Sequence, residues 1–322
     1  MFPCFILLSI IENGIRLIQW KKILRANDTM ASISQGIFQE CVRVNIRSVE
    51  VLMYTFIYTN YRIADINWNS TINWFICFLG VDLGFYTYHR LSHEINILWA
   101  VHQAHHSAED FTMISSLRQA VLQPFIAGFA YLPMAFFVTP SIFLVHLQLS
   151  ELYMIWIHTE IIDRLGFLEL ILNTPSHHRV HHGRNRKYID KNYAGTLIIW
   201  DRLFGTFEPE DDNEPVAYGL VKPIQSYNPF WIQFHHFFSI YQRFRTTEGF
   251  KNKLFVLIKG PGWQPGDKSR FGDINQVPVI TYPVKYWSPE IPFHNKLYTL
   301  WHFLIILIFY VLITNFHDEI TQ

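Results

Sequence analysis

The sequence predicts an all-α integral membrane protein built as a bundle of several transmembrane helices. Of its 322 residues, 50% are hydrophobic and 17% are aromatic, while only 16% are charged. A soluble domain carries about 25% charged residues, so this composition is typical of a protein that faces lipid. Several segments are also apolar over nearly the ~20 residues that a helix needs to cross a bilayer. The alternative is that these segments are core helices of a soluble protein.

The N-terminal part, residues 1–71, is expected to form membrane and amphipathic helices. Its first ten residues are apolar but lack a basic start and a small-residue cleavage site, which indicates a partial membrane segment rather than a removable signal peptide. The pattern predicts an amphipathic helix around residues 33–46 and a weak membrane segment at 51–61. Residues 61–73 are polar and predict a loop.

Stronger membrane segments follow in the central part of the chain, residues 72–210. Residues 72–88 are apolar except for Asp82. Residues 121–137 and 141–157 are both apolar and are joined by Thr-Pro, which predicts a hairpin that crosses the membrane twice or dips into it and returns.

The remaining segments differ from this central part in composition. Residues 211–296 are more polar and rich in turns, which predicts an irregular cap with short helices at most. Residues 297–322 contain the apolar stretch 298–315 and predict a C-terminal transmembrane helix. The formal net charge is zero, so nothing indicates nucleic-acid binding. The three cysteines are widely spaced without a CxxC pair, which argues against a disulfide framework or a thiolate site.

Three histidine clusters stand out between residues 89 and 182. Their spacings are H-x3-H, H-x2-H-H and H-x2-H-H, and positions three or four apart share one face of a helix. Each cluster can therefore aim two or three ring nitrogens at one point. Imidazole is the commonest ligand side chain for iron, copper and zinc. The predicted metal ligands are His89, His93, His102, His105, His106, His178, His181 and His182.

These clusters can share one metal site only if they end on the same side of the membrane. The first two follow the segment 72–88 directly, and the hairpin 121–157 returns the chain to that side before the third. Basic residues such as Arg90, Arg179 and Arg184 flank the clusters, which places this side in the cytosol by the positive-inside rule. The predicted architecture is a multi-helix transmembrane bundle with a cytosolic histidine-rich metal site and an irregular cytosolic cap.

The number and type of ligands favour two iron ions. Zinc proteases use H-E-x-x-H, whereas the first cluster is H-R-L-S-H. One zinc takes three or four ligands, so eight histidines fit two metals with about four ligands each. Histidine sites with open positions suit iron that activates O2. The Glu-x-x-His pattern of soluble di-iron bundles is absent, so the predicted di-metal site is rich in nitrogen.

Two residues outside the clusters are candidates for the same site. His158 ends the apolar hairpin on the cluster side, where it is either a ninth ligand or a membrane-interface residue. Asp82 lies seven residues before His89, two turns away on the same helical face. Because a carboxylate in an apolar segment needs a partner, Asp82 either accepts the second N–H of a ligand histidine or hydrogen-bonds another helix.

Three further acidic residues, Glu94, Glu109 and Asp110, directly follow cluster residues. They are candidates to support the ligands or to bind a basic cofactor. For Glu109 and Asp110 a solvated loop is the expected environment, whereas Glu94 is open between a solvated loop and a role at the site. The histidines not assigned to the site are His146, His177, His235, His236, His294, His302 and His317.

The clusters and their surroundings resemble the fatty acid hydroxylase (sterol desaturase) superfamily of membrane di-iron oxygenases. The shared framework runs from about residue 80 to 207 and includes Asp82-x3-Tyr86-x2-His89-Arg90 together with the three clusters. It continues with Asn192-Tyr-Ala-Gly195 and Trp200-Asp-Arg-Leu-Phe-Gly-Thr206. The resemblance implies that the eight cluster histidines are metal ligands and that residues 72–210 are the catalytic domain.

A narrower resemblance, over roughly residues 45–266, is to the members of this superfamily that cleave glyceryl ethers. It includes His102-Gln-Ala-His-His-Ser-Ala-Glu-Asp110 and Lys259-Gly-Pro-Gly-Trp263. It implies a multi-pass enzyme of the endoplasmic reticulum membrane that uses O2, non-haem iron and tetrahydrobiopterin. The substrate would be an ether lipid (an alkylglycerol), hydroxylated beside the ether oxygen and released as a fatty aldehyde and a glycerol derivative. Glu94 matches this pattern and is the predicted pterin contact.

Three other functions compete with this hypothesis. One is another lipid hydroxylase or desaturase of the superfamily, acting on a sterol or acyl chain and reduced by cytochrome b5. Another is a metal-binding membrane transporter, although transporters place ionisable ligands at mid-membrane, whereas these clusters lie at segment ends. The third is an inactive scaffold that retains metal.

Overall fold

The computed structural model describes residues 2–19, 21 and 24–315, and these residues contain helices and no named strands. They divide into two compact units, Met1–Val284 and Lys285–Gln322. The helices of the first unit are α1 (Phe2–Ile18), α2 (Ala26–Tyr61), α3 (Thr71–Glu94), α4 (Asn96–His102), α5 (Gln123–Tyr131), α6 (Pro140–Trp156), α7 (Pro175–His181), α8 (Ile199–Phe204), α9 (Pro229–Thr246) and α10 (Phe250–Ile258). The second unit contains α11 (Phe293–Asn315).

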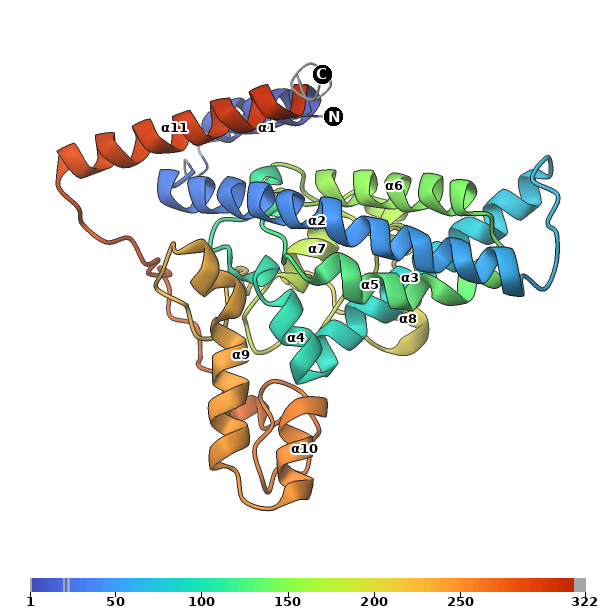
Figure 1. Cartoon of the computed structure of the whole chain (residues 1–322). Coiled ribbons are helices and arrows are strands. Elements are labelled where there is room, and N and C mark those ends of the chain that lie inside the picture. Colours follow the sequence, from blue (N-terminus) through green and yellow to red (C-terminus); the bar gives the residue numbers. More distant parts are fainter. Residues whose placement is uncertain (1, 20, 22–23, 316–322) are drawn as a thin grey trace. The chain divides into compact units, whose positions relative to one another are not determined.

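Helices α2, α3, α5 and α6 pack against one another as a bundle in the first unit (Figure 1). Its core contains Tyr54 of α2, Val81 of α3, Tyr131 of α5 and Phe143 of α6. The rings of Tyr54 and Phe143 stack with centroids 4.4 Å apart. Gly84 allows α3 to approach α5 closely, because an added Cβ would lie 2.9 Å from the Tyr131 ring.

The N-terminal half of the bundle is more continuous than predicted. The amphipathic segment 33–46 and the apolar segment 51–61 belong to one helix, the 36-residue α2. It contains no proline, and its glycine, Gly36, lies where an added Cβ would meet Leu117 at 3.1 Å. The predicted loop after this helix is present between α2 and α3.

The predicted hairpin 121–157 is present, but its first arm is short. Helix α5 has nine residues and continues into the 3-10 helix Leu132–Phe136, which contains Pro133. At 1.5 Å per residue, α5 spans about 14 Å, roughly half the hydrocarbon core of a bilayer. Helix α6 begins at Pro140 and has 17 residues.

The cap is more helical than predicted. Residues 229–258 form α9, of 18 residues, and α10, which pack against each other and against α4. Asn96, at the start of α4, ties them together: its backbone N–H donates to the Lys259 carbonyl at 2.8 Å, and its side chain donates to the Val256 carbonyl at 2.7 Å. The prediction that the cap contains short helices at most is therefore wrong, because α9 is a long helix.

Among the described residues, one helix is long and apolar enough to cross a membrane. It is Phe293–Thr314 in the second unit, and no residue in its most apolar 18-residue stretch is buried. The predicted spans at 72–88 and 121–157 form helices but do not meet this criterion. Residues 316–322 of the predicted C-terminal segment lie outside the described residues.

Candidate metal centre

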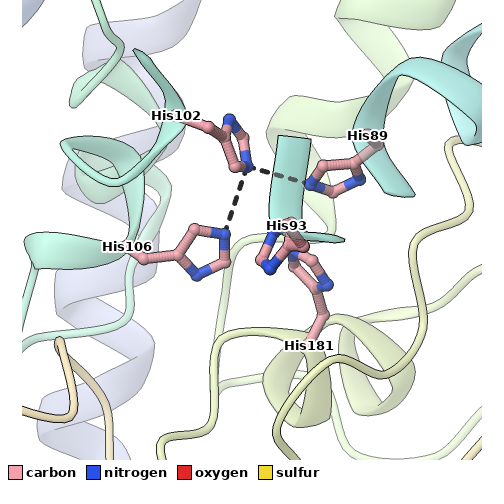
Figure 2. Close-up of side chains that lie close together, drawn as sticks. All are labelled: His89, His93, His102, His106 and His181. Carbon is pink, nitrogen blue, oxygen red and sulfur yellow. Dashed lines mark hydrogen bonds between the residues drawn. The ribbon is translucent and has the colours of Figure 1, made fainter. Parts of the chain in front are cut away.

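Nine buried histidines form two adjacent groups in the first unit. Within each group, one ligand atom from every residue lies within 4.8 Å of the others. The five-histidine group consists of His89, His93, His102, His106 and His181. The four-histidine group consists of His105, His158, His178 and His182. Figure 2 shows the rings of the five-histidine group turned toward one another. The two groups together contain all eight cluster histidines and His158.

The two H-x2-H-H clusters are each divided between the groups. His102 and His106, four residues apart, belong to the five-histidine group, whereas His105 between them belongs to the other. In the third cluster the division is reversed, because His181 joins the five-histidine group without its neighbours. Two rings of each cluster therefore share a point, as predicted, and the third ring serves the neighbouring group.

Helix ends and short helices position these rings. The last two turns of α3 carry His89 and His93 one turn apart. Helix α7 starts at Pro175, whose fixed φ and missing N–H suit the first helical position. The second cluster is not on one helix, because α4 ends at His102 and His105 begins a separate 3-10 helix.

Hydrogen bonds fix the tautomers of several rings. The Nδ1–H groups of His89, His105 and His158 donate to backbone carbonyls at 2.8, 3.1 and 2.6 Å. A neutral ring that donates from Nδ1 keeps its lone pair on Nε2. Burial lowers the pKa of His105 to about 4 and that of His102 well below its ordinary value, so these rings are neutral at pH 7.

The Nε2 atoms face one another at distances too short for two lone pairs. Nε2 of His89 lies 3.1 Å from Nε2 of His102, whose Nδ1 lies 3.3 Å from the Gln123 amide oxygen. In the other group, Nε2 of His158 lies 3.3 Å from Nε2 of His105. Neither neutral ring of these pairs has a proton there to donate, so a cation is needed between them. Two nitrogens bound to one metal at ~2.1 Å and at right angles lie about 3.0 Å apart, close to the observed spacing.

Two further nitrogens also require a partner. Nε2 of His93 and Nε2 of His181 are buried and have no hydrogen-bond partner in the described part of the chain. Leaving such a group unpaired costs about 1–3 kcal/mol. An ion in the five-histidine group would remove this cost, so the donor atoms fit nitrogen-bound metal.

Asp82 is buried, but it does not orient a histidine directly. Its carboxylate accepts the backbone N–H groups of Thr196 and Leu197 at 2.7 and 3.0 Å, and the Trp200 indole N–H at 2.9 Å. The predicted acceptance of a histidine N–H is therefore wrong. The alternative prediction, a bond to another helix, holds for Trp200 in α8, because its indole N–H donates to Asp82.

The acidic residues after the clusters are all paired. Glu94 is buried at the end of α3 and its carboxylate lies 2.7 Å from Nε of Arg90 and 3.8 Å from Arg270. Glu109 and Asp110 each lie 3.1 Å from the Arg25 guanidinium, with side chains only 11% and 14% exposed. The expected solvated loop is therefore wrong for both residues, which join the start of α2 to the second cluster.

Residues outside the predicted set also hold the site. Asp201 is fully buried and accepts backbone N–H groups of the loop that contains Tyr193. Arg179, inside the third cluster, forms a bidentate pair with Glu210 and donates to the Thr159 carbonyl beside His158. The sequence contained a signal for Asp201 in the Trp-Asp-Arg-Leu-Phe-Gly-Thr motif, but no role followed from it.

Comparison with known proteins assigns the family. Residues 74–206 match the Fatty acid hydroxylase family model. The chain is 49% identical over 315 residues to alkylglycerol monooxygenase of Homo sapiens, covering 96% of this chain and 69% of that protein. The chain belongs to the alkylglycerol monooxygenase family. Other alkylglycerol monooxygenases, from Xenopus tropicalis and Danio rerio, are 50% and 46% identical over 91% and 95% of this chain and 65% and 68% of their own length.

Membership in the alkylglycerol monooxygenase family confirms the resemblance found in the sequence. The chain spans about two thirds of the length of these alkylglycerol monooxygenases. No solved structure matches it significantly. The family and the histidine groups together support a monooxygenase with a non-haem iron site.

Proposed function

We propose that this chain binds two iron ions and hydroxylates the ether-linked carbon of alkylglycerols, using O2 and tetrahydrobiopterin. The observation that carries the proposal is the pair of buried histidine groups in a chain about half identical to alkylglycerol monooxygenases. Five and four nitrogen ligands leave exchangeable positions at two six-coordinate ions. The products are a fatty aldehyde and a glycerol derivative, because a hydroxyl group beside an ether oxygen forms a hemiacetal that breaks down.

When bound, an iron pair would activate O2, the oxidant; two electrons from tetrahydrobiopterin and two from the C–H bond would balance the insertion of one oxygen atom, and the other atom would leave with the pterin or as water. The chain's own histidine rings carry no proton on the Nε2 atoms that face the centre, so these atoms can bind a metal. The Nδ1–H of His89 donates to the Tyr193 carbonyl and that of His105 to the Arg118 carbonyl, which aims both Nε2 atoms inward. None of the nine histidines is more than 7% exposed, which limits the access of bulk water to the centre.

A membrane setting suits an ether lipid substrate. Large apolar side chains on the outer faces of the bundle are exposed, which is unfavourable in water and favourable against acyl chains. They include Leu52, Phe56, Phe75, Ile76, Leu149 and Leu152. Each CH2 of an alkyl chain contributes about 0.8 kcal/mol when it is buried, so a long chain can be held by burial alone. We place the enzyme in the endoplasmic reticulum membrane, as a multi-pass protein with its metal centre on the cytosolic side.

We assign pterin binding to the region of Glu94. This carboxylate follows His93 directly, is buried, and is held in place by Arg90 and Arg270. A carboxylate can accept hydrogen bonds from the amino and ring N–H groups of a pterin. Glu94→Gln should therefore raise the KM for tetrahydrobiopterin and leave the KM for alkylglycerol nearly unchanged. An equal rise in both KM values would contradict the assignment.

The direct test is aldehyde release from an alkylglycerol by membranes that contain the chain, with reduced pterin and O2. His105→Ala should abolish the reaction, while His235→Ala, outside both histidine groups, should retain it. Activity with NADH and cytochrome b5, on a sterol or acyl lipid and without pterin, would instead support another hydroxylase of the superfamily. Full activity of His105→Ala would refute the ligand assignment.

A further inference from the structure

We propose that Asp201 is a positioning residue for only one of the two ions, the one in the five-histidine group. It holds the loop of residues 191–197, whose carbonyls orient two rings of that group and no ring of the other. The inference rests on the proposed two-ion centre and adds that the two ions depend on different parts of the chain.

The loop delivers two backbone carbonyls to the five-histidine group. The Lys191 carbonyl accepts from Nδ1 of His181 at 2.9 Å, and the Tyr193 carbonyl accepts from Nδ1 of His89 at 2.8 Å. Such bonds fix both the tautomer and the rotation of a ligand ring. One of these rings comes from the first cluster and the other from the third, so the loop sets their mutual orientation.

Two buried carboxylates accept hydrogen bonds from this loop, one at its middle and one at its end. Asp201 accepts the backbone N–H groups of Tyr193 and Ala194, both at 2.8 Å, and the hydroxyl of Thr206 at 2.6 Å. Asp82 accepts the N–H groups of Thr196 and Leu197, at the end of the loop. Both carboxylates are at most 1% exposed. Because Asp201 holds the residue whose carbonyl contacts His89, its removal should disturb that ring first.

Gly195 provides independent support for close contact between the loop and α3. A Cβ added at Gly195 would lie 2.9 Å from Oδ1 of Asp82 and 2.9 Å from the Phe85 ring. Neither neighbour is free to move, since Asp82 is buried and Phe85 packs against His89 with ring centroids 5.2 Å apart. An alanine at this position would push the loop away without removing any hydrogen-bonding group.

The four-histidine group is supported by other elements. Its His105 donates to the Arg118 carbonyl and its His158 to the Met154 carbonyl, at the end of α6. Among the described hydrogen bonds, none joins a ring of this group to the loop 191–197. Displacement of the loop should therefore leave the ring orientations of the four-histidine group unchanged.

The test is to count iron bound by the purified full-length chain and to identify which ion is lost. The wild-type protein, loaded anaerobically with 57Fe(II), should bind two ions. Asp201→Ala should bind one with unchanged affinity and the other about 10-fold more weakly, the lower end of the range for lost partners of a ligand histidine, because Asp201 acts through the Tyr193 carbonyl. Gly195→Ala should give the same pattern. Asp212→Ala, which removes a carboxylate that is 82% exposed, is the matched control and should bind both ions normally.

Mössbauer spectra assign the missing ion by comparison with two ligand variants. The signal lost in Asp201→Ala should be the one lost in His181→Ala and should be retained in His178→Ala. Two ions bound with wild-type affinity in both Asp201→Ala and Gly195→Ala would overturn the inference, as would equal weakening of both ions in a folded variant. If the wild-type chain binds fewer than two irons, the two-ion function itself is refuted, so the two failures are distinguishable.

Discussion

His158 offers the sharpest test of the four-histidine group, because the sequence left it open between a metal ligand and a membrane-interface residue. Its ring is 2% exposed, and its Nε2 lies 3.0 Å from Nε2 of His178 and 3.3 Å from Nε2 of His105. His158→Ala removes one of four nitrogen donors and leaves the other rings in place. If His158 is a ligand, the variant should lose metal affinity. If it is an interface residue, only the stability of the variant should change.

The magnitude follows from linkage between binding and folding. Loss of a direct ligand should weaken iron at least as much as the ~100-fold upper range for outer-shell partners. At free iron well above both dissociation constants, a 100-fold weaker site stabilises the fold by about 2.7 kcal/mol less. At about 2.1 cal/mol/K of unfolding entropy per residue, a chain of 322 residues has roughly 0.7 kcal/mol/K, so the iron-induced rise in Tm should shrink by about 4 °C.

The assay is thermal unfolding of the purified protein in detergent, with and without Fe(II) under anaerobic conditions. His146→Ala is the matched control, because this ring is also buried, lies on α6, the helix just before His158, and has its nitrogens 2.9 and 3.1 Å from the carbonyl oxygens of Ile142 and Trp74 rather than in a histidine group. It should lower Tm equally with and without iron. If His158→Ala behaves in the same way, with its iron-induced rise intact, the ligand assignment is refuted.

Two further predictions concern residues outside the metal ligands. Burial lowers the pKa of His236 to about 3, and its Nε2 lies 2.7 Å from Oδ1 of Asn96, so the unfolded chain takes up the proton first as pH falls below 6.5. His236→Gln should therefore lose less stability than wild type between pH 7.5 and 5.5, by about 1.3 kcal/mol, and equal pH dependence in chemical unfolding would contradict this. Arg179→Met leaves Glu210 unpaired and removes a donor to the Thr159 carbonyl, and should cost about 3–5 kcal/mol of unfolding free energy. Adding Glu210→Gln should recover part of that loss, and strictly additive costs would contradict the pairing.

The convergence of the histidines could be predicted because its cause is local. Spacings of three and four residues place rings on one side of a short helix whatever the rest of the chain does, so His89 and His93 were predictable as a pair. The division of the second and third clusters between two groups was not. It depends on where α4 stops and on where the fold places α7, and neither is encoded in a spacing.

Long-range partners account for the predictions that were wrong. One of the two roles expected for Asp82 was a bond to a ring seven residues away, yet its partners are more than 110 residues later in the chain. Asp110 was expected in solvent, yet Arg25 covers it from 85 residues earlier. A charged side chain in a sequence shows that it needs a partner, but the partner's identity follows only from the tertiary fold.

Iron K-edge X-ray absorption on the reconstituted chain measures the ligands of the bound ions directly. The structure predicts a first shell of four to five nitrogens per iron at about 2.0–2.2 Å, with the outer-shell scattering that imidazole rings produce. The expected signal has no sulfur and few oxygen neighbours. A shell dominated by oxygen or sulfur, or fewer than two imidazoles per iron, would contradict the claim that these nine histidines hold the catalytic metal.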